Sequence, residues 1–114
     1  MKTLQPSALT ELERTTLDQA VGIIRKHLPD ARIILYGSRA RGEAREDSDY
    51  DILVITDSPV STPIENAMYD KIYDILLETD QWVSVFFMDR STWDSPVCRG
   101  SPLYAEICRD GSEL

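Results

Sequence analysis

The sequence predicts a small α/β domain in which a mixed sheet of three or four strands is flanked by helices. Short apolar runs rich in β-branched residues alternate with longer segments whose apolar residues recur every three or four positions. The 114 residues can bury one hydrophobic core but not two, and 42% hydrophobic with 28% charged residues is typical of a globular protein. We therefore expect residues 1–114 to form one domain, with residues 1–9, which show no periodic pattern, as a loose arm.

Composition narrows the classes of function. The net charge of -8 argues against nonspecific binding to nucleic acid, because phosphate contacts from Lys and Arg supply most of that affinity. No apolar run approaches the roughly 20 residues of a membrane-spanning helix, and the first residues lack the apolar core of a secretory signal. Cys98 and Cys108 lack metal-ligand spacing, so we expect reduced thiols and a cytoplasmic protein without a membrane partner.

The first helix is predicted to begin at Thr10-Glu11-Leu12-Glu13, which fits a capping box. Apolar residues then form one stripe, and Pro29-Asp30 ends the helix. The stripe consists of Leu17, Ala20, Val21, Ile24 and Leu28. Residues 31–36 follow as a short apolar run, which we interpret as a buried strand.

A glycine-serine turn follows this strand. Gly37 ends the strand, and Ser38 is placed to cap a short helix over about residues 39–44, whose first amides would form an anion site. Glu46-Asp47-Ser48 is a polar turn. The next strand is predicted over residues 49–56, where alternation places Asp49 and Asp51 on one face and Tyr50 on the other. Whether the two strands pair directly, and in which sense, stays open.

The second half of the chain continues the alternation. Thr62-Pro63-Ile64-Glu65 combines a cap, a proline at the first helical position and a glutamate at the third, so a helix is expected to Glu78. Residues 81–88 are aromatic and β-branched, which indicates a third strand. Residues 89–100 are predicted as a surface connection, and Ser101-Pro102 begins a last helix that Gly111 ends.

The candidate site is the joined pattern of Gly37-Ser38, ten further residues, and Asp49-Tyr50-Asp51. A glycine lets the backbone approach phosphate closely, and the serine hydroxyl can hold phosphate oxygens. Paired carboxylates on one strand face suit hard divalent cations such as Mg²⁺. Each half alone is a weak signal, but together they are the parts needed for metal-assisted transfer of a nucleotidyl group.

This pattern resembles the signature of the nucleotidyltransferase fold related to DNA polymerase β, and especially its minimal, MNT-type bacterial members. The resemblance covers roughly residues 9–110 and implies that Gly37 and Ser38 contact the triphosphate of ATP or another nucleotide. It implies that Asp49 and Asp51 are the catalytic ligands of Mg²⁺, while a substrate hydroxyl attacks the α-phosphate and pyrophosphate leaves. Arg41 is a candidate phosphate contact, with a structural or solvated arginine as the alternative.

One position departs from the family pattern. Active members usually carry a third carboxylate on the next strand, and here the aligned position is Ser84, which cannot supply the charge. Asp80 and Asp89 lie toward opposite ends of that strand, so either would need a displaced register to join the site. Catalysis is favoured because the turn and both first carboxylates are intact.

Three hypotheses follow from the resemblance. The first is a Mg²⁺-dependent enzyme that transfers AMP from ATP to a hydroxyl of a protein partner, as the antitoxin of a toxin-antitoxin pair with a HEPN-type helical protein. The second is a catalytically degenerate module that binds nucleotide or partner, which Ser84 favours. The third is a small-molecule nucleotidyltransferase, which is weaker because a lone domain offers little acceptor pocket.

Overall fold

The structure is a computed structural model that describes residues 2–3, 9–45 and 47–114. The loose arm expected over residues 1–9 therefore lies mostly outside the described residues. Within that arm, Lys2–Thr3 forms a short strand, β1. The α/β class is confirmed: helices pack on both faces of a mixed sheet.

The three predicted strands form the centre and one edge of the sheet, whose order is β1-β5-β2-β3-β4. They are β2 (Arg32–Tyr36), β3 (Tyr50–Thr56) and β4 (Val83–Asp89). The strands β2 and β3 pair directly and run antiparallel, with Tyr36 opposite Asp51. The strand β4 runs parallel to β3, which places Ser84 opposite Asp51.

Two short strands extend the sheet beyond the predicted three or four. The strand β5 (Ser112–Glu113) pairs antiparallel with β2, and β1 pairs parallel with β5. Each has two residues, which is too short to produce a period-2 pattern in the sequence.

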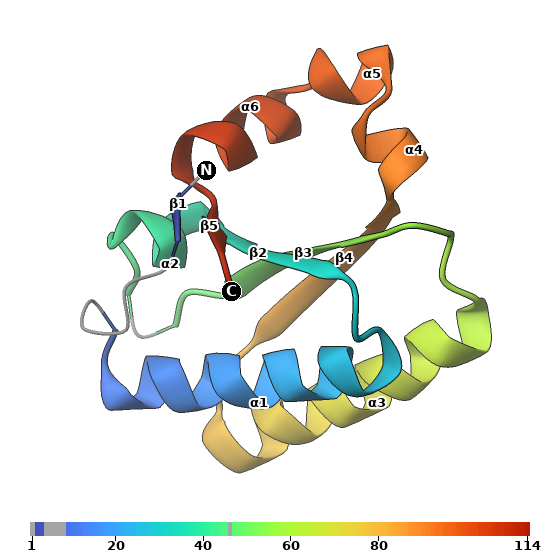
Figure 1. The fold of residues 1–114 in the computed structure, drawn as a ribbon. Coiled ribbons are helices and arrows are strands. Elements are labelled where there is room, and N and C mark those ends of the chain that lie inside the picture. Colours follow the sequence, from blue (N-terminus) through green and yellow to red (C-terminus); the bar gives the residue numbers. More distant parts are fainter. Residues whose placement is uncertain (1, 4–8, 46) are drawn as a thin grey trace.

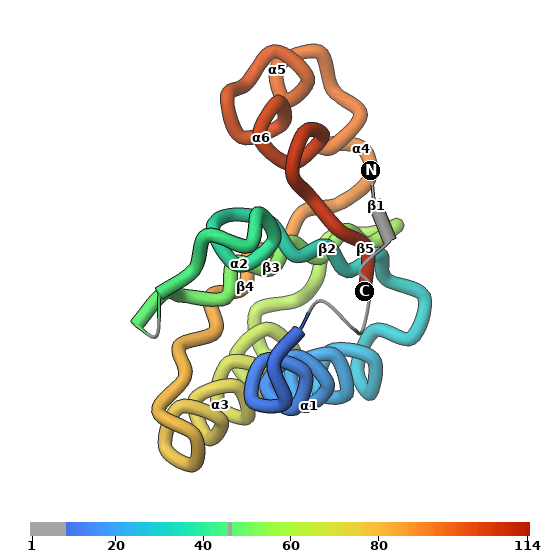
Figure 2. Tube along the Cα trace, turned by 90° about the vertical axis from the view of Figure 1, so that its left-hand side faces the viewer, coloured from blue at the N-terminus to red at the C-terminus, as the bar shows by residue number. Residues whose placement is uncertain are grey.

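Helices cover both faces of the sheet (Figures 1 and 2). One face packs against α1 (Glu11–His27) and α3 (Thr62–Thr79), which lie side by side. The other face carries α4 (Arg90–Trp93), α5 (Pro96–Arg99) and α6 (Pro102–Asp110). No helix in the described part of the chain combines the length and the apolar character that a membrane crossing requires.

Strand alternation divides the core into two clusters. Tyr50, Ile52 and Val54 face α1 and α3, whereas Leu53 and Ile55 face the C-terminal helices together with Ile34 and Ile107. Trp93 belongs to the second cluster and is only 6% exposed. The prediction of a surface connection over residues 89–100 is therefore wrong at this position, since α4 turns Trp93 inward onto the sheet and against the Tyr104 ring.

Helix starts were predicted with mixed success. The capping box at α1 is confirmed: the Glu13 amide donates to Thr10 Oγ1 at 3.1 Å, and the Thr10 amide donates to Glu13 Oε1 at 3.0 Å. The cap of α3 is Ser61 rather than Thr62, and its side chain makes no capping hydrogen bond.

The predicted capping role of Ser38 is wrong. The short helix α2 (Gly37–Arg41) begins one residue before Ser38, its N-cap is Tyr36, and no side chain caps it. The chain turns at Gly37 itself, which has φ +76°, so Ser38 already lies inside the first turn. Gly42, with φ +74°, ends the helix after one turn, and its amide donates to the Ser38 carbonyl.

Candidate active site

The glycine-serine turn and the second carboxylate meet at the end of the β2–β3 pair. A β-carbon built on Gly37 would lie far inside the contact distance of Asp51 Oδ2 and 3.3 Å from Asp51 Cγ. A glycine is therefore required there on two grounds, the positive φ and the carboxylate packed on its backbone. The structure thus brings Gly37 and Asp51, which are fourteen positions apart in the sequence, into direct contact.

Negative charge accumulates around Asp51. Burial raises the pKa of its carboxyl group, and the neighbouring charges of Asp49 and of Glu106 in α6 raise it further, while Arg41 lowers it. Asp49 is exposed and lies just before β3, whereas Asp51 is half-buried. A divalent cation bound between two carboxylates would offset the repulsion between their charges.

The donor set at this position suits Mg²⁺ in kind. Asp49 and Asp51 supply oxygen ligands, and Mg²⁺ is usually held by one or two carboxylates together with substrate phosphates. Among the described residues, no group of three or more His, Cys, Asp or Glu side chains is arranged to hold a metal ion. The chain can therefore offer two carboxylates here, and a bound nucleotide would have to supply further oxygen ligands.

Ser84 occupies the place that was aligned with a third acid. It pairs with Asp51 across the parallel β3–β4 ladder, so both side chains leave the same face of the sheet from neighbouring strands. The aligned position is thus next to Asp51, and it carries an exposed hydroxyl group. Asp89 lies at the other end of β4, opposite Thr56, and Asp80 precedes the strand.

Arg41 is engaged by acidic side chains of the chain itself. Its guanidinium lies 3.4 Å from Glu106 Oε1 and 3.8 Å from Asp110 Oδ2, both in α6, and 3.3 Å from Glu43 Oε2. These ion pairs tie α2 to the last helix beside Asp51. Sequence reasoning found Arg41 but missed Glu106 and Asp110, because no short-range signal links a helix sixty residues downstream to this turn.

Tyr36 completes this side of the site. It lies opposite Asp51 in the antiparallel ladder and packs against the cluster under α6. Burial raises the pKa of its phenol, and the charges of Asp51 and Glu106 raise it further, so the hydroxyl stays protonated at neutral pH and can donate a hydrogen bond.

A separate hollow lies on the other face of β3. Its volume is about 860 Å³, and its walls include Arg39, Tyr50, Gln81 and Trp82 but neither Asp49 nor Asp51. Because Tyr50 alternates with Asp51 along the strand, this hollow opens on the α1 side of the sheet. It is therefore distinct from the carboxylate pair.

The small mixed sheet, in which a glycine turn touches a carboxylate of the neighbouring strand, has the architecture that the sequence resemblance implied. The comparison with protein families agrees: the nucleotidyltransferase domain model matches residues 17–91. The chain therefore belongs to the nucleotidyltransferase domain family.

Solved structures show the same fold. A toxin-antitoxin structure with AMP-PNP has a TM-score of 0.56 and 17% identity, covering 84% of this chain and 69% of that chain. A mutant of the MntA-HpeT toxin-antitoxin pair has a TM-score of 0.56 and 18% identity, with the same two coverages. A complex of tri-AMPylated Shewanella oneidensis HEPN toxin with MNT antitoxin has a TM-score of 0.53 and 18% identity, covering 88% and 69%. A search of the curated proteins returned no match.

Proposed function

We propose that this protein is a Mg²⁺-dependent nucleotidyltransferase that transfers AMP from ATP to a hydroxyl group of a protein partner. The single observation that carries the proposal is the contact between the Gly37 backbone and the Asp51 carboxylate. This contact places the proposed phosphate-binding turn beside the carboxylate pair, and membership of the nucleotidyltransferase domain family supports the proposed chemistry. We take residues 1–114 as one such domain, acting in the cytoplasm where ATP is available.

In this proposal Asp49 and Asp51 hold the cation, and the Gly37 backbone with Ser38 binds the triphosphate. When bound, the cation would neutralise phosphate charge and lower the pKa of the attacking hydroxyl. The acceptor oxygen forms a bond to the α-phosphorus while the bond to pyrophosphate breaks. Arg41 lies close enough to lower the pKa of Asp51, and its ion pairs with Glu106 and Asp110 hold it beside the carboxylate pair.

The partner we propose is a helical protein of HEPN type. The support is the fold shared with solved toxin-antitoxin pairs, one of which contains an AMPylated HEPN toxin with an MNT antitoxin. The proposed role is therefore that of an antitoxin that modifies or binds its partner.

A second function is favoured by one specific observation, the hydroxyl of Ser84 where a third carboxylate would lie next to Asp51. In that alternative the domain binds nucleotide and partner without transferring AMP. The two functions share the fold and the turn, and they differ only in chemistry at the carboxylates.

One assay separates them. The protein is incubated with labelled ATP, Mg²⁺ and a candidate HEPN-type partner protein, and label on the partner is measured alongside complex formation. The test variant is Asp49→Asn with Asp51→Asn, and the matched control is Asp70→Asn with Asp74→Asn, which removes two exposed carboxylates from α3. Label that disappears only in the test variant supports transfer. A complex without label in the wild type contradicts the enzyme and supports the binding module.

A further inference from the structure

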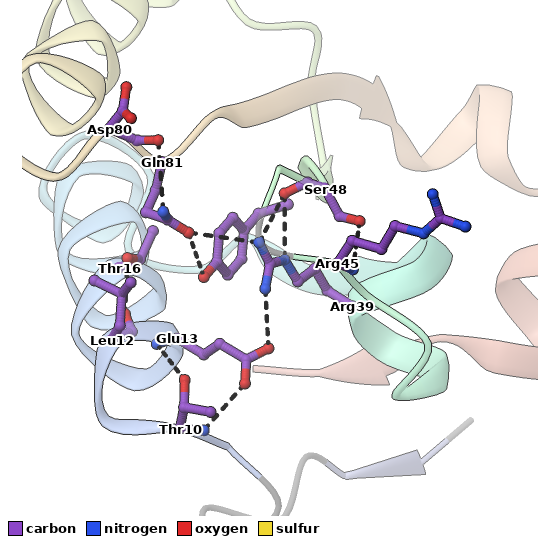
Figure 3. Close-up of polar contacts among 10 residues, drawn as sticks. Thr10, Leu12, Glu13, Thr16, Arg39, Arg45, Ser48, Asp80 and Gln81 are labelled. Atoms are coloured by element: carbon purple, nitrogen blue, oxygen red, sulfur yellow. Dashed lines mark hydrogen bonds and ion pairs between the residues drawn. The ribbon is translucent and has the colours of Figure 1, made fainter.

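Arg39 is a nearly buried cation at the centre of a network that four segments share (Figure 3). Its side chain is only 8% exposed. A guanidinium is costly to bury unless its donors are used, so its contacts indicate what the position is for. It follows Ser38 directly in the sequence, although its side chain points away from the Asp51 face.

Arg39 donates to the backbone carbonyl of Ser48 through two of its nitrogens. Nη2 donates to this oxygen at 2.9 Å and Nε at 3.3 Å, so two donors of one guanidinium converge on one carbonyl. Ser48 directly precedes Asp49. The side chain of the residue after Ser38 is thereby bonded to the residue before the first carboxylate.

The other contacts fix the guanidinium in place. Nη1 lies 3.4 Å from Glu13 Oε2, and Glu13 is itself held by the capping box of α1. The guanidinium carbon lies 4.3 Å above the centre of the Tyr50 ring, and the Tyr50 hydroxyl donates to Gln81 Oε1 at 3.1 Å. A cation stacked on a buried ring and paired with an anchored carboxylate has little freedom to move.

The segment between these anchors is tied to α2 at its start, where the Glu43 amide donates to the Ser38 carbonyl at 3.0 Å. After α2 ends at Gly42, the described residues up to Asp49 contain no helix or strand. Ser48 forms a local turn with Arg45, in which the Arg45 amide donates to Ser48 Oγ at 2.9 Å and the Ser48 amide donates to the Arg45 carbonyl at 3.1 Å. This turn orders the end of the loop but does not tie it to α2.

We propose that Arg39 is a positioning residue that sets the spacing between the Gly37-Ser38 turn and Asp49 by binding the Ser48 carbonyl. Asp51 is already fixed against the turn by the β2–β3 ladder and by its contact with Gly37. Arg39 lies on the Tyr50 face of β3, opposite Asp51, so it acts on the Asp49 carboxylate through the backbone. The role rests on the proposed function, because the spacing matters only if phosphate and cation occupy the two halves together.

The test compares Arg39→Met with Arg25→Met. Arg25 is a matched control because its guanidinium also binds the backbone carbonyls of a loop, at the other end of α1. It donates to the Ala31 oxygen at 2.6 Å and to the Pro29 oxygen at 3.2 Å. Both variants lose a buried or half-buried tether of the same kind. Only one of them lies between the two halves of the candidate site.

Three measurements are made: hydrogen exchange and kcat on the folded proteins, well below their unfolding temperatures, and the unfolding midpoint with and without Mn²⁺ and ATP. Hydrogen exchange of the metal-free proteins should accelerate over residues 43–49 in Arg39→Met and around residues 28–32 in Arg25→Met. The thermal stabilisation produced by Mn²⁺ with ATP, together with kcat for AMP transfer, should fall in Arg39→Met alone. Because a misplacement of about 1 Å can lower a rate roughly 100-fold, we expect a kcat loss of that order with a smaller change in KM.

The outcomes are distinguishable. Unchanged exchange over residues 43–49 in Arg39→Met would overturn the proposal, since the loop would then be held by other contacts. Faster exchange with kcat and the Mn²⁺-ATP response equal to those of Arg25→Met would overturn it as well. Partial recovery in Arg39→Lys, which restores one donor to Ser48, supports it. A wild-type protein without any Mn²⁺-ATP response instead fails the proposed function before the variants are compared.

Discussion

Gly37→Ala is a small substitution that acts directly on the candidate site. Gly37 has a φ of +76°, and the Asp51 carboxylate packs against its Cα. The methyl group of an alanine there would therefore overlap Asp51 Oδ2. Gly42 provides a control inside the same helix turn. It has a φ of +74°, and nothing lies within 4 Å of the methyl that alanine would add there.

The expected effects are a loss of stability that both alanine variants share and a loss of activity that is specific to Gly37→Ala. A non-glycine residue in the left-handed region costs about 1–2 kcal/mol, and this applies to both variants. Unfolding midpoints should then fall by roughly 4 °C for each kcal/mol. Only Gly37→Ala must also displace the Asp51 carboxylate, and a shift of about 1 Å in a positioned group can lower a rate about 100-fold.

The assay is AMP transfer from labelled ATP to the partner, with the Mn²⁺-ATP thermal response as a second readout. We expect Gly42→Ala to stay within a few-fold of wild type and Gly37→Ala to fall about 100-fold, at similar losses of stability. Equal activity in the two variants would refute the reasoning, because it would show that the position of Asp51 against the turn is irrelevant.

Three further predictions concern charge and backbone. Ser84→Asp should lower the unfolding midpoint without divalent cations, because it adds a negative charge next to Asp51, and Mg²⁺ should reverse most of that loss; a deficit that ignores Mg²⁺ would argue against a shared cation site. Asp51→Asn should stabilise the metal-free protein at neutral pH: the native pKa lies above the ordinary 3.8, so the carboxyl stabilises the fold when protonated and loses that contribution as pH rises through its native pKa. Thermal unfolding in chelator should show the gain shrinking in acid buffer, and a gain constant with pH would contradict the sign. Gly22→Ala, in the exposed interior of α1 with open space around it, should stabilise by about 1 kcal/mol and leave AMP transfer unchanged, as unfolding in urea and the transfer assay would check.

Local signals predicted the elements because their causes are local. The capping box at Thr10 and the apolar stripe of α1 depend on residues three or four positions apart, and the alternation that puts Asp51 and Tyr50 on opposite faces is a property of one strand. Ser38 was misassigned as a cap for a physical reason. Positive φ at Gly37 starts the helix turn two residues earlier than a serine cap would.

Contacts between distant segments could not be predicted in the same way. The antiparallel pairing of β2 with β3, the two-residue strands at the sheet edge and the burial of Trp93 are decided by tertiary packing. The same holds for Glu106 and Asp110, which meet Arg41 only because α6 packs beside α2. Arg39 and Arg41 are only two positions apart, yet they lie on opposite faces of β3 and bind different acids.

The two arginines differ in what they do: Arg39 contacts the loop before Asp49, and Arg41 affects the charge around Asp51. Arg39 is nearly buried, forms an ion pair with Glu13 and donates a hydrogen bond to the Ser48 carbonyl, on the face of β3 opposite Asp51. Arg41 is partly exposed and shared among three carboxylates, so it compensates Asp51 only in part. With a hydroxyl at Ser84, the pair Asp49 and Asp51 supplies all the anionic ligands that β3 and β4 offer there. Two carboxylates match the way Mg²⁺ is bound when phosphates complete its shell, so metal and nucleotide should bind this site together rather than separately.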